Sequence, residues 1–137
     1  MKVYFDTNIV IDILLKREPF FGTSFEVLTK VAEGYAEGFI GANAIVDIFY
    51  IVNKNLRDNN KTINSIFDVL EILSLADTTA QDIFNAKHLN MPDYEDAVIA
   101  TIAFRENASY IVTRNIADYA NSPVPAITPT DFITGLV

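Results

Sequence analysis

Acidic residues that stand beside apolar segments are the groups in this chain that are best suited to catalysis. The chain contains no cysteine and one histidine, His88, so thiolate chemistry is excluded and a Ser-His-Asp relay or histidine metal cluster has almost nothing to build on. Any chemistry must therefore rest on carboxylates, hydroxyls and metal ions. Hard divalent cations prefer such oxygen ligands.

Asp6 is the first of these acids. It follows a β-prone run that begins at Lys2, and it precedes Thr7 and Asn8, which can cap a following helix. Taken alone, Asp6 is explained equally well as a cap or turn residue, because Asp is common where a strand turns into a helix.

Two further acids lie in helical patterns. Asp47 interrupts the apolar stretch 44–52, where a solvent-facing position is the simpler interpretation. Asp96 follows Asp93 at capping-box spacing, and acids in a first turn also favour the helix dipole. We predict that Asp93 caps this helix, whereas Asp96 faces the same edge of the fold as Asp6.

A polar segment, 113–119, follows a predicted strand near the end of the chain. A turn explains its composition, and so does a role in holding a metal ion or water, because Thr113, Asn115 and Asp118 all offer oxygen atoms. Taken singly, none of these residues outweighs its structural explanation.

Short apolar strands alternate with helices along the chain. Strands are predicted near 2–5, 39–40, 73–76, 110–113 and 126–128, and helices near 9–15, 25–32, 43–56, 63–72, 79–89, 93–107 and 131–136. This order predicts one α/β domain over 1–137, with three layers and a central, mainly parallel sheet of four to five short strands flanked by helices. Ligands of such sheets collect at the carboxyl ends of the strands, where the strand order reverses, so the scattered acids can converge there.

Composition limits the classes of protein to which the chain can belong. Half of its 137 residues are hydrophobic, which suits a single packed domain. No apolar run approaches the roughly 20 residues of a membrane span, and the N-terminus makes a poor signal peptide, so we expect a cytoplasmic protein without membrane association. The net charge of -8 argues against generic nucleic-acid binding. It does not exclude a nuclease, because carboxylates loaded with divalent ions make a pocket locally positive.

Four segments together resemble the PIN-domain family. Residues 3–10 resemble its opening, 93–103 its third acidic motif and 110–119 its fourth, and 125–132 look like its closing strand and helix. The resemblance covers essentially the whole chain in matching order. Two positions depart from it: Asp47 stands where the family usually has Glu, and Asn115 stands where it often has an acid.

The resemblance implies a divalent-metal-dependent ribonuclease that holds one or two Mg²⁺ or Mn²⁺ ions and leaves a 5′-phosphate. It implies Asp6 and Asp96 as principal ligands, with Asp47 completing the shell. The remaining implied groups are Thr113, Asn115 and Asp118, ordering waters or a second ion, Thr7 and Asn8 in support, and Arg114 contacting RNA. Whether Asn115, Asp118 or both serve is left open.

Many small PIN proteins of the VapC group are toxins of toxin–antitoxin pairs. The partners that this resemblance implies are RNA, a cognate antitoxin protein and a second copy of the chain as a homodimer.

Two other functions compete with the nuclease. The chain would also suit a catalytically weak PIN domain that serves as a binding or assembly module. A magnesium-dependent phosphatase using Asp6 is the third hypothesis, but the haloacid dehalogenase pattern requires an acid at the position of Asn8.

Overall fold

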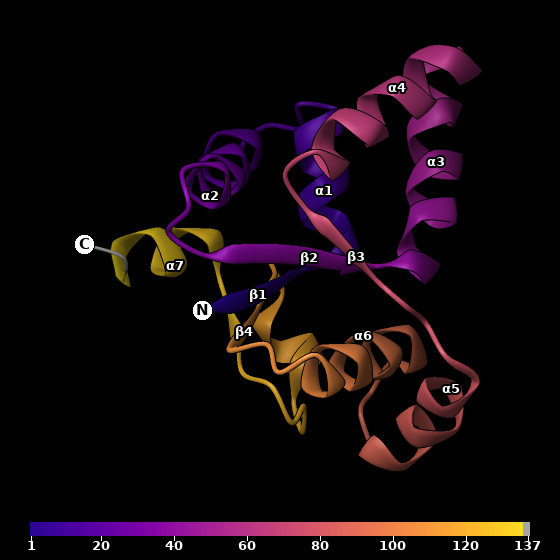
Figure 1. The fold of residues 1–137 in the computed structure, drawn as a ribbon, viewed down its shortest axis with the longest axis vertical. Coiled ribbons are helices and arrows are strands. Elements are labelled where there is room, and N and C mark those ends of the chain that lie inside the picture. Colours follow the sequence, from indigo (N-terminus) through magenta and orange to yellow (C-terminus); the bar gives the residue numbers. More distant parts are fainter. Residues whose placement is uncertain (136–137) are drawn as a thin grey trace.

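A parallel sheet of five strands forms the centre of the fold (Figure 1). The structure is a computed structural model and describes residues 1–135. The strands are β1 (Lys2–Phe5), β2 (Glu37–Gly41), β3 (Ser74–Ala76), β4 (Tyr110–Val112) and β5 (Ala126–Ile127). The helices are α1 (Thr7–Leu14), α2 (Phe21–Ala32), α3 (Ala42–Leu56), α4 (Asn59–Leu70), α5 (Ala80–Ala86), α6 (Tyr94–Arg105) and α7 (Pro129–Gly135). Two 3₁₀ helices complete the list, η1 (Lys87–Leu89) and η2 (Ile116–Tyr119).

The strand order β3-β2-β1-β4-β5 places the first strand in the middle of the sheet. All four strand pairs are parallel, and Tyr4 of β1 lies opposite Phe39 of β2 and Ile111 of β4. The chain moves outward from β1 through β2 to β3, and then returns to the other side of β1 for β4. The strand order therefore reverses between β1 and β4, where ligands of such sheets are expected.

Helices cover both faces of the sheet and give the three layers that the sequence predicts. Helices α1 to α4 lie on one face, and α5 and α6 lie on the other (Figure 1). Helix α1 packs against α2 and α3, whereas α6 packs against α5, β4 and η2. Because α6 has neighbours on several sides, its residues from Ala97 to Ala103 are all buried and its apolar pattern runs right around the helix.

Completely buried side chains of the core are concentrated in the two central strands, β1 and β4. Val3, Tyr4 and Phe5 of β1 and Ile111 and Val112 of β4 are completely buried. A parallel strand with helices over both faces has no solvent-facing side, so its sequence is a continuous apolar run. Short runs of this kind are what the sequence analysis identified as strands.

The predicted element boundaries differ most from the structure at the following places. The helix predicted over 79–89 ends at Ala86 and continues as η1, after which Asn90 takes a left-handed conformation with φ 55°. Helix α2 begins at Phe21 and α4 at Asn59, each before the predicted apolar pattern. The closing turn predicted over 131–136 corresponds to α7, and residues 136–137 of the predicted domain lie outside the described residues. Within residues 1–135, no helix has both the length and the hydropathy to cross a bilayer.

Candidate metal centre

A cleft of about 620 Å³ opens at the carboxyl edge of the sheet. It lies where β1 ends, between α3 and the first turn of α6. Its described wall includes the acids Asp6, Asp47, Asp93, Glu95, Asp96 and Asp118. Among the described residues that line it, none is a lysine, arginine or histidine. The four acids proposed as site residues therefore come from four different elements to one surface.

Asp6 is fixed at the floor of this cleft. Its backbone N–H donates to the carbonyl of Val112 at 3.0 Å, which extends the β1–β4 pairing by one residue. The Thr113 hydroxyl donates to Asp6 Oδ2 at 2.7 Å, and both side chains are buried. Burial raises the pKa of the Asp6 carboxyl, while the Thr113 hydroxyl and the nearby amides of Thr7 and Asn8 act to lower it. Asp6 occupies the N-cap position of α1 without a side-chain capping bond, so its carboxylate remains directed to the cleft.

Asp93 caps α6, as the sequence predicts. It is the N-cap, and its Oδ1 accepts from the Asp96 backbone N–H at 3.0 Å. Both side chains line the cleft, and the metal-binding role expected of Asp96 stays a prediction. Burial and then the charge of Asp6 raise the pKa of Asp96 to about 7, with Asp93 and Asp118 contributing in the same direction.

The remaining predicted residues are more exposed. Asp47 in α3 and Asp118 in η2 are exposed side chains in the wall of the cleft. Asn115 is also exposed but is not part of that wall, and its backbone N–H donates to the Thr113 hydroxyl at 3.1 Å. Of the two residues left open by the sequence, the structure thus places Asp118 on the cleft.

Glu95 also lines the cleft, although the sequence analysis assigned it no role. Burial, followed by the charge of Asp47, raises the pKa of its carboxyl. The sequence feature that could have predicted this is the position of Glu95 in the first turn of α6, next to Asp96. That signal was weak because acids in a first turn commonly serve the helix dipole alone.

The described carboxylates line the same cleft, but they are not close enough together for three of them to coordinate one ion. Within residues 1–135, no three acidic or histidine side chains are close enough together to surround one ion. The single shell predicted for Asp6, Asp47 and Asp96 is therefore not preformed. Their chemistry still fits Mg²⁺ or Mn²⁺, because Mg²⁺ keeps several of its waters and often takes only one or two protein carboxylates. Asp6 and Asp96 would hold such an ion, because no described basic side chain in the cleft wall balances their charge and burial raises the pKa of both groups.

Arg114 has a structural partner that the sequence analysis missed. Its Nε donates to Oδ2 of Asp12 at 2.6 Å, and its guanidinium carbon lies 4.0 Å from the centre of the Phe20 ring. Asp12 in α1 is completely buried and also pairs with Arg17 at 3.7 Å. This pair ties α1 to the segment that follows β4. The RNA contact expected of Arg114 remains a prediction.

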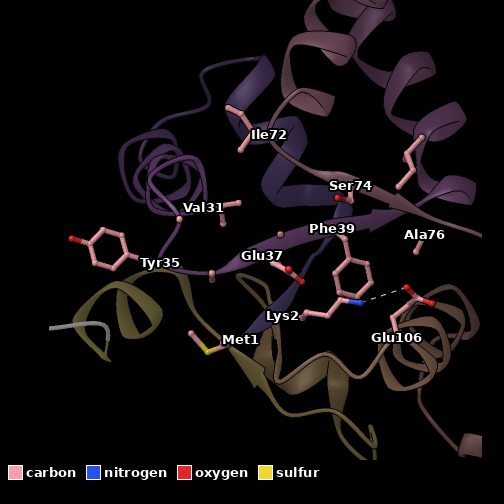
Figure 2. Close-up of a pocket in the computed structure, with 14 residues that line it drawn as sticks. Met1, Lys2, Val31, Tyr35, Glu37, Phe39, Ile72, Ser74, Ala76 and Glu106 are labelled. Atoms are coloured by element: carbon pink, nitrogen blue, oxygen red, sulfur yellow. Dashed lines mark ion pairs between the residues drawn. The ribbon is translucent and has the colours of Figure 1, made fainter.

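A second hollow lies at the opposite, amino end of the strands (Figure 2). Its volume is about 590 Å³, close to that of the acidic cleft. Two of its charged side chains compensate each other, because Lys2 Nζ pairs with a Glu106 oxygen at 3.6 Å and lies 5.0 Å from the Phe39 ring (Figure 2). The larger group of carboxylates, with no described basic side chain among them, is found at the carboxyl edge.

The fold and the acidic cleft at the strand-order reversal together define a PIN domain. The sequence profile of the PIN domain family matches residues 2–117, and the chain belongs to this family. No curated protein matches the chain in sequence.

Solved structures share the fold at low sequence identity. A chain in the crystal structure of VapBC2 from Rickettsia felis, bound to a DNA fragment from their promoter, is 22% identical with a TM-score of 0.74, over 93% of this chain and 98% of that one. A chain in the DNA-bound VapBC structure from Salmonella typhimurium is 17% identical with a TM-score of 0.72, over 94% and 98%. VapC20 from Mycobacterium tuberculosis, a toxin that cleaves the sarcin-ricin loop, is 9% identical with a TM-score of 0.62, over 80% and 86%.

Proposed function

We propose that this chain is a metal-dependent endoribonuclease that hydrolyses RNA phosphodiester bonds. The observation that supports this most is the meeting of Asp6, Asp47, Asp96 and Asp118 in the wall of one cleft of a PIN domain. The same cleft contains no described basic side chain, so only a bound cation can offset its charge. A perturbed pKa in a cleft, arising from burial and like charges, is typical of functional sites.

The side chains have distinct tasks in this proposal. Asp6 and Asp96 hold the divalent ion, and the Thr113 hydroxyl fixes the orientation of Asp6. Asp47 and Asp118, being exposed, order waters or a second ion near the scissile phosphate. When bound, the ion makes hydroxide available near neutral pH and offsets charge on the phosphate. RNA can approach these acids only after their charge has been offset.

The test is cleavage of an end-labelled RNA by the purified chain. We expect cleavage in Mg²⁺ or Mn²⁺, no cleavage in EDTA, and recovery when metal is restored in excess. Asp68→Asn, which removes an exposed acid of α4 far from the cleft wall, is the matched control and should cleave like the wild type. Cleavage that continues in EDTA would refute metal dependence.

We further propose that the chain acts as the toxin of a toxin–antitoxin pair. Its fold matches chains from the VapBC complexes, and α3 presents the exposed apolar side chains Val46 and Tyr50 in the wall of the cleft. Exposed apolar groups next to a site suit a protein partner that covers it. Expression of the chain should arrest growth, and co-expression of the product of the neighbouring reading frame should relieve the arrest. Arrest by Asp6→Asn at equal protein level would contradict a toxic nuclease.

The binding-module alternative has two observations in its favour. Asp47 is shorter than the Glu usual at its position, and no three-carboxylate shell is preformed in residues 1–135. Calorimetry with Mn²⁺ separates the two functions, since a binding module that has lost its metal centre would show no saturable heat of binding. Hydrolysis of a small phosphomonoester without RNA cleavage would instead favour the phosphatase.

A further inference from the structure

A buried hydroxyl without a partner lies next to the acidic cleft. Tyr119 ends η2, and its side chain is 5% exposed. Its Oη atom has no hydrogen-bond partner among the described residues, a condition it shares there only with the Ser24 hydroxyl. Buried polar groups are almost always paired, so an unpaired phenol calls for an explanation.

Tyr119 is placed so that the carboxylates of the cleft act on it. Its neighbour Asp118 lines the cleft, and η2 packs against α6, which carries Asp96. Burial, and then the charges of Asp6 and Asp96, raise the pKa of the Tyr119 hydroxyl far above its ordinary value. A phenol is protonated at neutral pH in any environment of this kind, since even an unperturbed tyrosine has a pKa of about 10, so the hydroxyl is available as a donor.

The two principal acids differ in the donors available to them. Asp6 already accepts a hydrogen bond of 2.7 Å from the Thr113 hydroxyl and faces the backbone amides of Thr7 and Asn8. The Asp96 carboxylate receives no hydrogen bond from the described residues, and every influence on its pKa acts to raise it. Because η2 packs against α6, an unpartnered donor and an unpartnered carboxylate lie on neighbouring elements beside the same cleft.

We propose that Tyr119 is a positioning residue of the metal centre, whose hydroxyl donates to the Asp96 carboxylate when that carboxylate closes on an ion. Carboxylates that ligate metals are generally held by a second partner, and a donor already in place lowers the cost of ordering them. Without an ion, repulsion among the acids keeps Asp96 from this arrangement. This inference rests on the proposed metal-dependent function.

The experiment compares Tyr119→Phe with the wild-type chain in two measurements. Calorimetry should show an Mn²⁺ dissociation constant about tenfold higher in the variant, within the range of changes in outer-shell partners. Urea unfolding in EDTA should show equal or higher stability, because phenylalanine keeps the ring and removes an unpartnered hydroxyl. In RNA cleavage, kcat should fall while KM is unchanged. A packing role would not weaken metal binding while sparing the fold.

Two other tyrosines provide controls. Tyr35→Phe removes a phenol that is 55% exposed at the opposite end of the sheet, and it should leave both measurements unchanged. Tyr4→Phe removes the acceptor of the Gly41 N–H, at 3.0 Å, and should lower stability in EDTA. Mn²⁺ affinity of Tyr119→Phe within twofold of the wild type would overturn the positioning role, and so would a joint loss of affinity and stability. A wild-type chain that binds no Mn²⁺ would overturn the proposed function itself.

Discussion

Asp6 and Asp82 are both nearly inaccessible carboxylates, yet the protein treats them in opposite ways. Asp82 lies between α5 and α6, where Arg105 donates to each of its oxygens at 2.9 Å. These bonds hold the pKa of Asp82 below its ordinary value. Asp6 has a hydroxyl partner but no cation, and burial raises its pKa.

The comparison teaches that burial of an acid does not by itself mark a functional site. Asp12 is completely buried as well, and it is balanced by Arg114 and Arg17. A charge that is compensated inside the fold serves structure, because removing either partner would leave the other buried and unpaired. A charge left uncompensated in a cleft costs stability and is available for a ligand.

The largest expected effect comes from neutralising the uncompensated acids. Asp6→Asn or Asp96→Asn should reduce RNA cleavage by at least about 100-fold, the upper end of losses seen for outer-shell groups, since these are the proposed ligands. Urea unfolding in EDTA should show no loss of stability, because each change removes like-charge repulsion. If either variant cleaves at the wild-type rate, the distinction between uncompensated, functional acids and compensated, structural acids would be wrong.

The next effect is on stability and concerns the compensated acid. Asp82→Asn should lower the free energy of unfolding by about 2 kcal/mol, less than the roughly 3–5 kcal/mol of a fully buried pair. The value is reduced because the Arg105 side chain is 35% exposed and remains partly hydrated. Cleavage per folded molecule should not change. Chemical denaturation at neutral pH provides the measurement, and a stability equal to wild type would contradict a structural role for the pair.

A smaller effect is the pH dependence of the metal-free protein. Unfolded aspartates lose their protons near pH 4, whereas Asp96 in the fold keeps its proton up to about pH 7, and Asp6 and Glu95 also have raised pKa values. Between about pH 4 and 7 the folded state binds more protons than the unfolded state, so its stability falls as pH rises.

Urea midpoints in EDTA measure this effect. The midpoint should be higher at pH 5 than at pH 7.5, and Asp96→Asn should reduce the difference. Asp82 acts in the opposite sense, since its lowered pKa gives stability that is lost only as pH falls below about 4. A midpoint that rises from pH 5 to 7.5 would contradict uncompensated repulsion in the cleft.

The smallest effect is expected at Asp93, which lines the cleft but serves α6 as its cap. Asp93→Asn keeps a good capping side chain, so stability and cleavage should both stay near the wild-type values. Assayed beside Asp96→Asn, this variant separates capping from metal binding. Equal loss of cleavage in the two variants would show that Asp93 is also a ligand.

Much of the fold could be predicted from the sequence because strands and helices carry different apolar periods. The central strands have continuous apolar runs, and the cap at Asp93 has a local spacing rule, so both predictions are confirmed. The break after Ala86 and the start of α2 at Phe21 were missed, because tertiary packing and not periodicity decides them.

The candidate site was less accessible to sequence reasoning. Residue type and place made Asp6 and Asp96 candidates, and the resemblance to the PIN family implied them as ligands; the strand order explains why they line one cleft. The pairing of Arg114 with Asp12, in contrast, joins residues that are far apart in sequence, and no local pattern reports it. Nor does any local pattern show that the Tyr119 hydroxyl would be buried without a partner.

The pairing of β1 with β4 has a consequence for the order of events during synthesis. Asp6 and Thr113, joined by a hydrogen bond, are 107 positions apart, and Thr113 N–H donates in turn to Ile127. At about 5–20 residues per second, roughly 5 to 20 seconds separate the appearance of these two residues. For most of that time a nascent chain has its first acid and half of its sheet but no completed centre. The ribosome must therefore add the 107 residues that lead from Asp6 to Thr113 before the centre can assemble.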